Sequence, residues 1–207
     1  SMTDVAIDMP AGPSEVAIVA DMTCHPEYVA ADMLSQAEHG MDSQSILFTD
    51  NEDVARAVLA EVEKQLEALP RKEMASSSLG HSRIVVLHDM EEAFEICNQY
   101  APEHLILAMD TAMDWADRVV NAGSVFLGHY SCESAGDYAS GTNHTLPTSG
   151  YAKAYSGVNL DSFCRKITFQ HLTPEGIDSI GRAVEVMAEA ESLDAHRNAM
   201  TLRMKNR

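Results

Sequence analysis

The sequence predicts an α/β fold with a largely parallel sheet, followed by a small, mainly helical tail. Short apolar runs typical of buried strands alternate with stretches of helical periodicity, which favours this class. The runs are apolar throughout, as expected for strands that are covered on both faces. We therefore expect one α/β domain over residues 1–158 and a mainly helical segment over residues 159–207.

Local signals predict the individual elements. We expect strands at residues 15–20, 45–49, 83–87, 105–109 and 124–127, and helices at 26–39, 51–69, 90–100 and 111–121. Pro26 suits a first helical turn, because its missing N–H costs little there, and Gly40 ends that helix. The serine-rich residues 70–82 are expected to be a helix end and a loop. In the tail, residues 166–171 are a candidate strand, and helices follow at 174–191 and 193–204.

Composition excludes several classes of function. The net charge of −18 repels phosphate backbones, so we expect no nucleic-acid partner. No run of 18 apolar residues occurs, which argues against a membrane span, and the N-terminus lacks the pattern of a signal peptide. The four cysteines form no CxxC pair and are expected to be free thiols. These features predict a cytoplasmic protein.

The stretch Glu133 to His144, ESAGDYASGTNH, is unusually dense in functional groups. It holds two carboxylates, a histidine, an asparagine and three aliphatic hydroxyls, with two glycines and neither helical nor strand periodicity. We therefore expect a polar loop following the apolar run at residues 124–127. Open α/β folds place their sites at the carboxyl ends of strands, so this loop is a candidate site, with a solvated surface loop as the alternative.

Two residues on the first predicted helix have the spacing of metal ligands. Gln36 and His39 are three apart and share a neighbouring face of the helix. Asp137, His144 and His196 offer further oxygen and nitrogen donors. A set of imidazole, carboxylate and amide groups without thiolate suits zinc in an open, catalytic arrangement. The alternative is that the helical histidine is structural or solvated.

A second candidate is the turn APEHL at residues 101–105. Pro102 turns the chain away from helix, and Glu103 and His104 follow it directly. In a turn, both side chains can reach one cavity, where histidine is a natural proton acceptor and glutamate can activate water. The alternative is an exposed polar turn. Ser14, Glu191 and His196 are weaker candidates, because capping or turn formation would also explain such polar residues.

Six blocks occur together and in order, and they carry a resemblance to a known family. They are DMPAGPSE (Asp8 to Glu15), LSQAEHG followed by DSQ (Leu34 to Gln44), APEHL (Ala101 to Leu105), NAGSVFLG (Asn121 to Gly128), ESAGDYASGTNHTLPT (Glu133 to Thr148) and LDAHRNA (Leu193 to Ala199). With these blocks the chain closely resembles the C-terminal half of histidinol dehydrogenase. The resemblance runs over nearly all 207 residues.

The resemblance implies a zinc-dependent, NAD-linked oxidation of L-histidinol, through the aldehyde, to L-histidine. By matched position, the implied zinc ligands are Gln36, His39, Asp137 and His196. His104 is the implied general base and Glu103 the implied activator of water. The implied substrate contacts are Ser14, Gln36, His39, His104, Asp137, His144, Glu191 and His196.

The family also implies a homodimer in which the C-terminal segments are exchanged, so that Glu191 and His196 complete the partner's site. Family chains contain an N-terminal half that this sequence lacks, and the NAD-contacting positions lie there. The α/β domain is therefore expected to be an incomplete Rossmann-like domain, and the chain a fragment without turnover of its own. The alternatives are a dehydrogenase of another small alcohol on the same scaffold, and a non-catalytic metal-binding or dimerisation fragment.

Overall fold

The computed structural model describes residues 9–10 and 12–205 and divides the chain into two compact units. The sheet unit ends at Phe163 and the tail unit begins at Cys164, a few residues after the boundary that the sequence predicts. Asp8 and Ala11 of the DMPAGPSE block lie outside the described residues.

The sheet unit contains five parallel strands in the order β3-β2-β1-β4-β5. The strands are β1 (Glu15–Ala20), β2 (Gln44–Thr49), β3 (Arg83–Val86), β4 (His104–Ala108) and β5 (Ser124–Leu127). Their order is that of the first five strands of a Rossmann sheet, and every pairing is parallel. The predicted α/β class with a parallel sheet is therefore confirmed, and the strands begin and end within one residue of the prediction.

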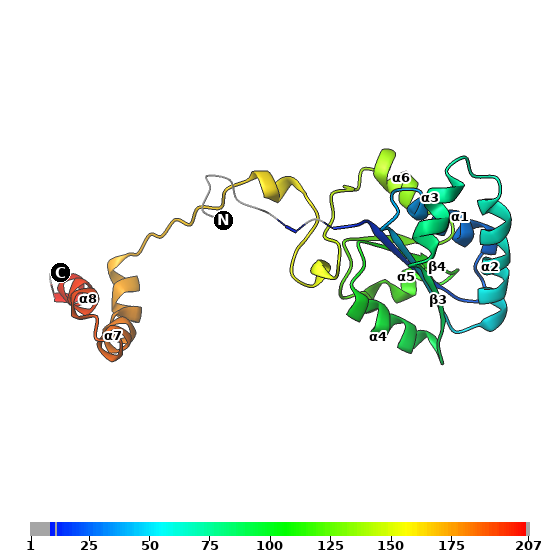
Figure 1. The fold of residues 1–207 in the computed structure, drawn as a ribbon. Helices are drawn as coiled ribbons and strands as arrows, with labels where there is room; N and C mark the ends of the chain where they lie inside the picture. The colour runs from blue at the N-terminus through cyan, green and yellow to red at the C-terminus, as the bar shows by residue number, and fades with distance from the viewer. Residues whose placement is uncertain (1–8, 11, 206–207) are drawn as a thin grey trace. The chain divides into compact units, whose positions relative to one another are not determined.

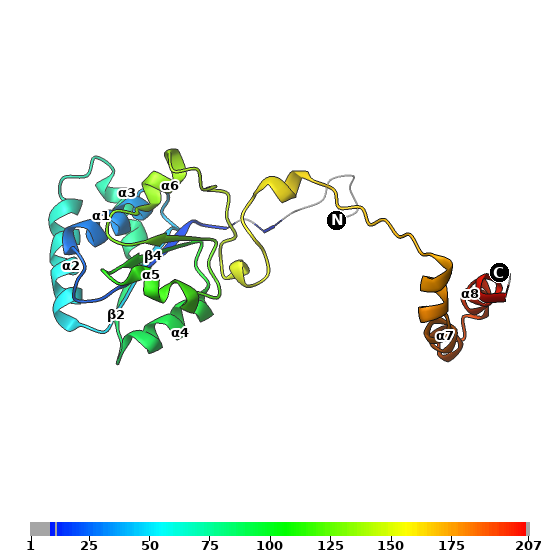
Figure 2. The same cartoon turned by 180° about the vertical axis from the view of Figure 1, so that it is seen from behind.

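Helices cover both faces of the sheet, as Figures 1 and 2 show. One face carries α1 (Pro26–Ala37), α2 (Glu52–Leu66) and α3 (Lys72–Leu79), and the other carries α4 (Met90–Tyr100) and α5 (Ala112–Trp115). β1 is buried along its whole length between two apolar clusters. Double coverage explains why these strands are continuous apolar runs rather than alternating ones.

Capping residues set the starts of the main helices. Asn51 accepts hydrogen bonds from the N–H groups of Asp53 and Val54 at the start of α2. Asp89 accepts one from Glu92 at the start of α4. These bonds satisfy backbone donors that have no partner within the helix. All four cysteines are free thiols, as predicted.

Three local predictions differ from the structure. Part of the expected loop at residues 70–82 is α3, because its Ala75 and Ser78 are buried against neighbouring elements, and tertiary packing overrides the weak helical signal. The helix expected at 111–121 is only α5 and a 3₁₀ turn at Ala116–Arg118. Residues 166–171 form no strand among the described residues, and their Ile167 and Phe169 are exposed.

The tail unit is helical, as the sequence predicts. It contains α7 (Pro174–Ala190) and α8 (Asp194–Lys205), which pack against each other. Thr173 caps α7 by accepting a hydrogen bond from the Gly176 N–H. Within the residues that the structure describes, no helix is long and apolar enough to cross a membrane.

Candidate active site and metal centre

The predicted site residues of the sheet unit gather at the amino ends of the strands. Ser14 directly precedes β1, and Glu103 and His104 stand at the start of β4. His104 pairs in register with Val16 of β1 and Ser124 of β5. The expectation of a site at the carboxyl ends is therefore wrong. The reason is that the chain turns back after β5 and returns its polar residues to the amino ends.

The turn before β4 positions Glu103 and His104. Ala101 ends α4 in the left-handed region, at φ 56°, and Pro102 follows it. Gly123 donates a backbone hydrogen bond to Pro102, and Ser124 donates one to Glu103. A Cβ on Gly123 would lie 2.5 Å from the Glu103 carbonyl oxygen, so this close approach of two backbones requires glycine.

Glu103 is 5% exposed and is held by two hydrogen bonds to one oxygen. Its Oε2 accepts from Ser14 Oγ at 2.7 Å and from the Glu15 backbone N–H at 3.0 Å. Burial raises the pKa of Glu103 to about 7, although these two bonds act in the opposite direction. A carboxyl group with this pKa exchanges protons near neutral pH. Because Glu103 is buried, the alternative of an exposed polar turn is wrong.

His104 is 3% exposed, its Nδ1 lies near three oxygens, and its Nε2 has no hydrogen-bond partner among the described residues. Nδ1 lies 3.4 Å from the Glu15 carbonyl oxygen, 3.6 Å from Glu103 Oε2 and 3.8 Å from Glu133 Oε1. These oxygens favour the tautomer with the proton on Nδ1, which leaves the Nε2 lone pair available. Burial is the main cause that lowers the pKa of His104, so the neutral ring is favoured.

The stretch expected to be a loop begins with a short helix, α6 (Glu133–Tyr138). Glu133 and Asp137 are four apart and therefore lie on the same face of α6. In both views, α6 lies on the side of the sheet that carries α1 (Figures 1 and 2). A Cβ on Gly136 would lie 2.5 Å from the Phe126 ring, so glycine allows α6 to pack closely on β5.

α6 and the turn that follows α1 together form a cluster of candidate metal-binding side chains. His39, Glu133 and Asp137 each present one ligand atom, and these three atoms lie within 4.8 Å of one another. Two buried nitrogens, Gln36 Nε2 and His104 Nε2, have no hydrogen-bond partner among the described residues, and His104 Nε2 lies 3.8 Å from Asp137 Oδ1. Nitrogen and oxygen donors without thiolate fit a zinc ion or a similar divalent cation.

Burial and carboxylates near this cluster raise the pKa of its buried member, Glu133. Glu133 is 1% exposed, and burial together with Asp137, Glu103 and Asp32 raises its pKa to about 8. His104 Nε2 lies 3.8 Å from Asp137 Oδ1, and His39 Nε2 lies 3.7 Å from Glu133 Oε1. A bound cation would lower the cost of keeping these carboxylates ionised in a buried site.

A cavity of about 390 Å³ is lined by both Glu103 and His144. Its lining also includes Thr145, Leu146 and Thr148. The Thr148 Oγ1 is buried without a hydrogen-bond partner in the part of the chain that the structure describes. His144, which follows α6 in the polar stretch, is therefore placed where it can contact a small polar molecule next to Glu103.

Comparison with known proteins assigns this arrangement to a family. A family profile described as histidinol dehydrogenase matches residues 2–204. The chain belongs to the histidinol dehydrogenase family. It is 61% identical over 205 residues to a histidinol dehydrogenase of Bacteroides fragilis, and 58% identical over 203 residues to a chloroplastic one of Oryza sativa.

The chain spans about half the length of these histidinol dehydrogenases. The alignments cover 99% of this chain but 48% of the Bacteroides protein, and 98% of this chain but 43% of the rice protein. A crystal structure of histidinol dehydrogenase from Elizabethkingia anophelis is 60% identical, with a TM-score of 0.95, and is matched over 98% of this chain and 47% of its own.

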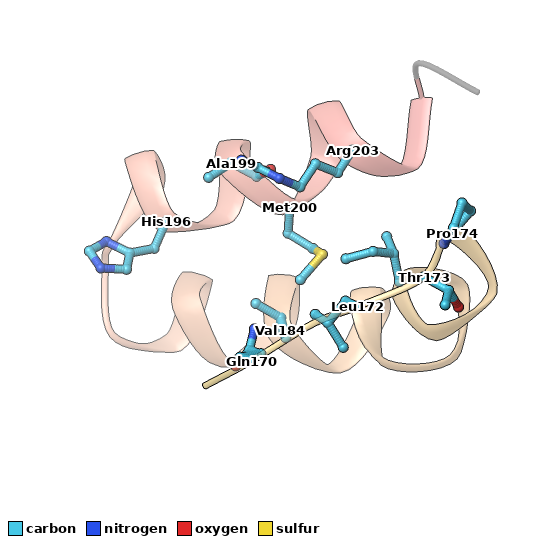
Figure 3. Close-up of a pocket in the computed structure, with 10 residues that line it drawn as sticks. Gln170, Leu172, Thr173, Pro174, Val184, His196, Ala199, Met200 and Arg203 are labelled. Atoms are coloured by element: carbon cyan, nitrogen blue, oxygen red, sulfur yellow. The ribbon is translucent and has the colours of Figure 1, made fainter. Parts of the chain in front are cut away.

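Within this family member, two of the predicted site residues lie in the tail unit. Glu191 ends α7 and His196 lies near the start of α8, and both are exposed. Figure 3 shows His196 at one end of a pocket between the two helices, with its ring directed away from Met200 and Leu172. The structure thus brings Ser14, Gln36, His39, Glu103, His104 and Asp137 together in one unit and leaves Glu191 and His196 in the other.

Sequence reasoning missed one residue of the cluster, Glu133. It was part of the polar stretch but received no role, because Gly136 and Gly141 indicate a loop. The signal that identifies it is the spacing of Glu133 and Asp137, which places both on one face only if the segment is helical. That helix forms because Gly136 packs on Phe126, a contact that the sequence does not reveal.

Proposed function

We propose that this chain supplies the metal- and substrate-binding half of an enzyme that oxidises L-histidinol, through the aldehyde, to L-histidine with NAD. The observation that carries the proposal is a buried His104 whose neutral form is favoured and whose Nε2, 3.8 Å from Asp137 Oδ1, has no hydrogen-bond partner among the described residues. A base next to a metal-binding cluster suits proton removal from a bound alcohol.

The metal in this proposal is zinc, held by Gln36, His39 and Asp137 of one unit and by His196 of a tail unit. Gln36 Nε2 is buried and has no hydrogen-bond partner in the described part of the chain, and rotation of the amide by 180° would put in its place the oxygen that a cation prefers. Bound zinc would hold and orient the substrate through its nitrogen atoms, which is a template role. Positioning of this kind lowers the entropy cost of the reaction.

The side chains carry the proton transfers. His104 Nε2 takes the hydroxyl proton while hydride leaves the adjacent carbon for NAD. In the second oxidation, Glu103 takes a proton from water as it adds to the aldehyde. Its pKa of about 7 suits both acceptance and release of a proton at neutral pH.

Substrate contacts follow from the charge of histidinol, which carries an ammonium and an imidazole. The carboxylates around His104 form an acidic pocket that attracts a cation. We assign Ser14 and His144 to substrate contacts from the same unit and Glu191 to a contact from a tail. His144 shares its cavity with Glu103, which supports this assignment.

We further propose a homodimer with exchanged C-terminal segments. Ile167 and Phe169, which precede α7, are 68% and 91% exposed, and apolar side chains at this exposure are suited to burial by a second chain. An exchanged tail would bring His196 and Glu191 to the partner's cluster. A cytoplasmic location is part of the proposal.

This chain spans about half the length of its relatives, which limits what it can do alone. The curated relatives are about twice as long as the matched region, and we assign the NAD contacts to their additional half. We therefore expect the isolated chain to bind zinc and histidinol without steady reduction of NAD. The isolated chain would then behave as the second candidate, a metal-binding module without catalysis.

The test is calorimetric titration of the zinc-loaded chain with L-histidinol. We expect saturable binding that is weakened at least about tenfold by Asp137→Asn, in the cluster, and far less by Asp42→Asn on the exposed surface. L-Histidinol should bind more tightly than a sulfonated propanediol, which lacks an imidazole. Equal affinity for both alcohols would favour the alternative dehydrogenase, and no binding of either would contradict the proposal.

Activity is tested by reconstitution. The N-terminal half of the Bacteroides fragilis relative, 61% identical in the shared region, is co-expressed with this chain, and NADH formation from histidinol is followed by absorbance. We expect NADH formation from the complex and none from either half. The His104→Ala complex should lose activity by about 10²-fold or more while it still binds zinc.

A further inference from the structure

Glu15, the first residue of β1, is a buried carboxylate to which the proposed reaction gives no role. It is 7% exposed, and both of its carboxylate oxygens have partners. Oε1 accepts the Ser149 backbone N–H at 3.0 Å, and the Tyr100 hydroxyl lies 3.3 Å from Oε2. Burying a carboxylate is costly unless donors surround it, so this residue requires the contacts that it makes. The side chain therefore ties the start of β1 to the end of α4 and to the segment that follows His144.

These contacts hold two further segments at the start of β1. Tyr100 is the last residue of α4 and directly precedes the APEHL turn, and its hydroxyl also lies 2.7 Å from Gln44 Oε1 on β2. Ser149 has a φ of 56°, in the left-handed region that a non-glycine residue occupies only when its surroundings hold it there. Glu15 provides that support by accepting the Ser149 N–H.

The backbone of the same residue contacts both groups to which we assign proton transfer. The Glu15 N–H donates to Glu103 Oε2 at 3.0 Å, and the Glu15 carbonyl oxygen lies 3.4 Å from His104 Nδ1. The Glu15 side chain reaches Tyr100 of α4, which lies on the opposite face of the sheet from α1 and α6 (Figures 1 and 2). Glu15 thus supports Glu103 and His104 from the face of the sheet opposite to the metal cluster.

We infer that Glu15 is a positioning residue, whose side chain anchors the start of β1 so that its backbone N–H and carbonyl hold Glu103 and His104 in place for proton transfer. The inference rests on the proposed function, because it assigns a role within the same site. A misplacement of about 1 Å in reacting groups can cost about 10²-fold in rate. Most of the proposed substrate contacts lie elsewhere, on α1, in the polar stretch after β5 and in a tail unit. Loss of the anchor should therefore lower kcat and leave the KM for L-histidinol nearly unchanged.

Amide hydrogen exchange in the full chain tests the anchor without any catalysis. In Glu15→Ala, the protection factor of the residue 15 N–H should fall more than about tenfold relative to that of Ala17, which is buried farther along β1. Glu15→Gln should keep this ratio within about threefold of the parent chain. Its amide retains an oxygen for the Ser149 N–H and can donate to the Tyr100 hydroxyl oxygen.

Asn51→Ala is the matched control for a general loss of stability. It removes the side-chain cap of α2, which follows the carboxyl end of β2, whereas the site lies at the amino ends of the strands. This variant should not lower the protection of residue 15 more than that of Ala17. Circular dichroism of each variant verifies the fold.

Activity is measured in the complex reconstituted with the N-terminal half of the Bacteroides fragilis relative. Glu15→Ala should lower kcat for NADH formation by about tenfold to 10²-fold, with the KM for L-histidinol within about threefold of the parental value. Tyr100→Phe removes one of the two side-chain contacts without opening a cavity, and should lower kcat by at least about threefold with the same constancy of KM. Glu15→Gln should recover most of the rate, and Asn51→Ala should keep the parental kcat.

Two results would overturn the inference. One is a parental ratio of protection factors in Glu15→Ala. The other is a parental kcat in both Glu15→Ala and Tyr100→Phe. Failure of the proposed function would look different: the parental complex would not oxidise L-histidinol, while the protection factors would still show whether Glu15 anchors the contact with Glu103.

Discussion

Ser14 Oγ donates a 2.7 Å hydrogen bond to Glu103 Oε2 and so joins the residue before β1 to the residue before β4. The same Glu103 oxygen accepts the Glu15 backbone N–H at 3.0 Å. Residues 89 positions apart are thereby fixed at the amino edge of adjacent strands. The relationship couples the geometry of the proposed water-activating carboxylate to the start of the central strand.

Replacing Ser14 by alanine should raise the pKa of Glu103. The Ser14 hydrogen bond favours the ionised carboxylate and lowers this pKa. Without it, the effect of burial, which raises the pKa, is less opposed. We expect an increase of about one unit, the equivalent of about 1.4 kcal/mol. Titration of the Glu103 side-chain ¹³C resonance in the metal-free chain measures it. Ser35→Ala, which removes a hydroxyl that bonds to the Asp32 carbonyl on α1, is the control, and a lower or unchanged pKa in Ser14→Ala would contradict the argument.

Gly136→Ala should destabilise the sheet unit and weaken metal binding. The added Cβ would lie 2.5 and 2.8 Å from atoms of the Phe126 ring, so α6 has to shift. Overpacking of this kind costs about 1–3 kcal/mol. Urea unfolding measures the loss of stability, and calorimetry measures how far the shift of α6 lowers the affinity for zinc. In Gly40→Ala the new Cβ meets only Ser43 Oγ at 3.7 Å, so that variant should change stability by less than about 0.5 kcal/mol.

Asp32 should make the metal-free chain less stable as the pH rises. Burial raises its pKa from 3.8 to about 7, so the folded state binds the proton more tightly than the unfolded state. The stability that the protonated group contributes is complete below about pH 4 and is lost as the pH rises through about 7. Asp32→Asn should therefore stabilise the chain by about 1–3 kcal/mol at pH 8 and by much less at pH 4.

Urea unfolding of both chains at the two pH values, with a chelator present, tests this difference. An Asp32→Asn chain that gains as much stability at pH 4 as at pH 8 would show that burial does not perturb this carboxyl. Asp53→Asn, at an exposed position in the first turn of α2, provides a reference for the loss of a surface charge.

Thr173→Ala should loosen α7 without affecting the sheet unit. The Thr173 hydroxyl accepts the Gly176 N–H at 3.2 Å, and loss of such a cap costs about 1 kcal/mol. Amide hydrogen exchange in the first turns of α7 should accelerate about fivefold, while exchange in β1 stays unchanged. Thr168→Ala, at an exposed position before the helix, should accelerate neither. Faster exchange in β1 would mean that the two units unfold together.

The sequence alone was sufficient to predict the strands and the main helices of the sheet unit. The apolar runs of β1 and β2 are long, continuous and bounded by polar residues, so local pattern and tertiary burial agree. Asn51 and Asp89 cap helices through contacts two or three residues away, which the sequence displays directly. The motif at APEHL and the pair Gln36 and His39 were also recognisable, because each is local.

Only the tertiary structure decided the edge of the sheet at which these residues meet and the partners that they find there. Glu133 becomes a neighbour of His39 and His104 because α6 packs on Phe126, a contact between elements that the sequence pattern does not encode. The perturbed pKa values of Glu103 and Glu133 likewise arise from burial among other carboxylates. The sequence determined which chemical groups are present, whereas packing determined their distances, their desolvation and therefore their chemistry.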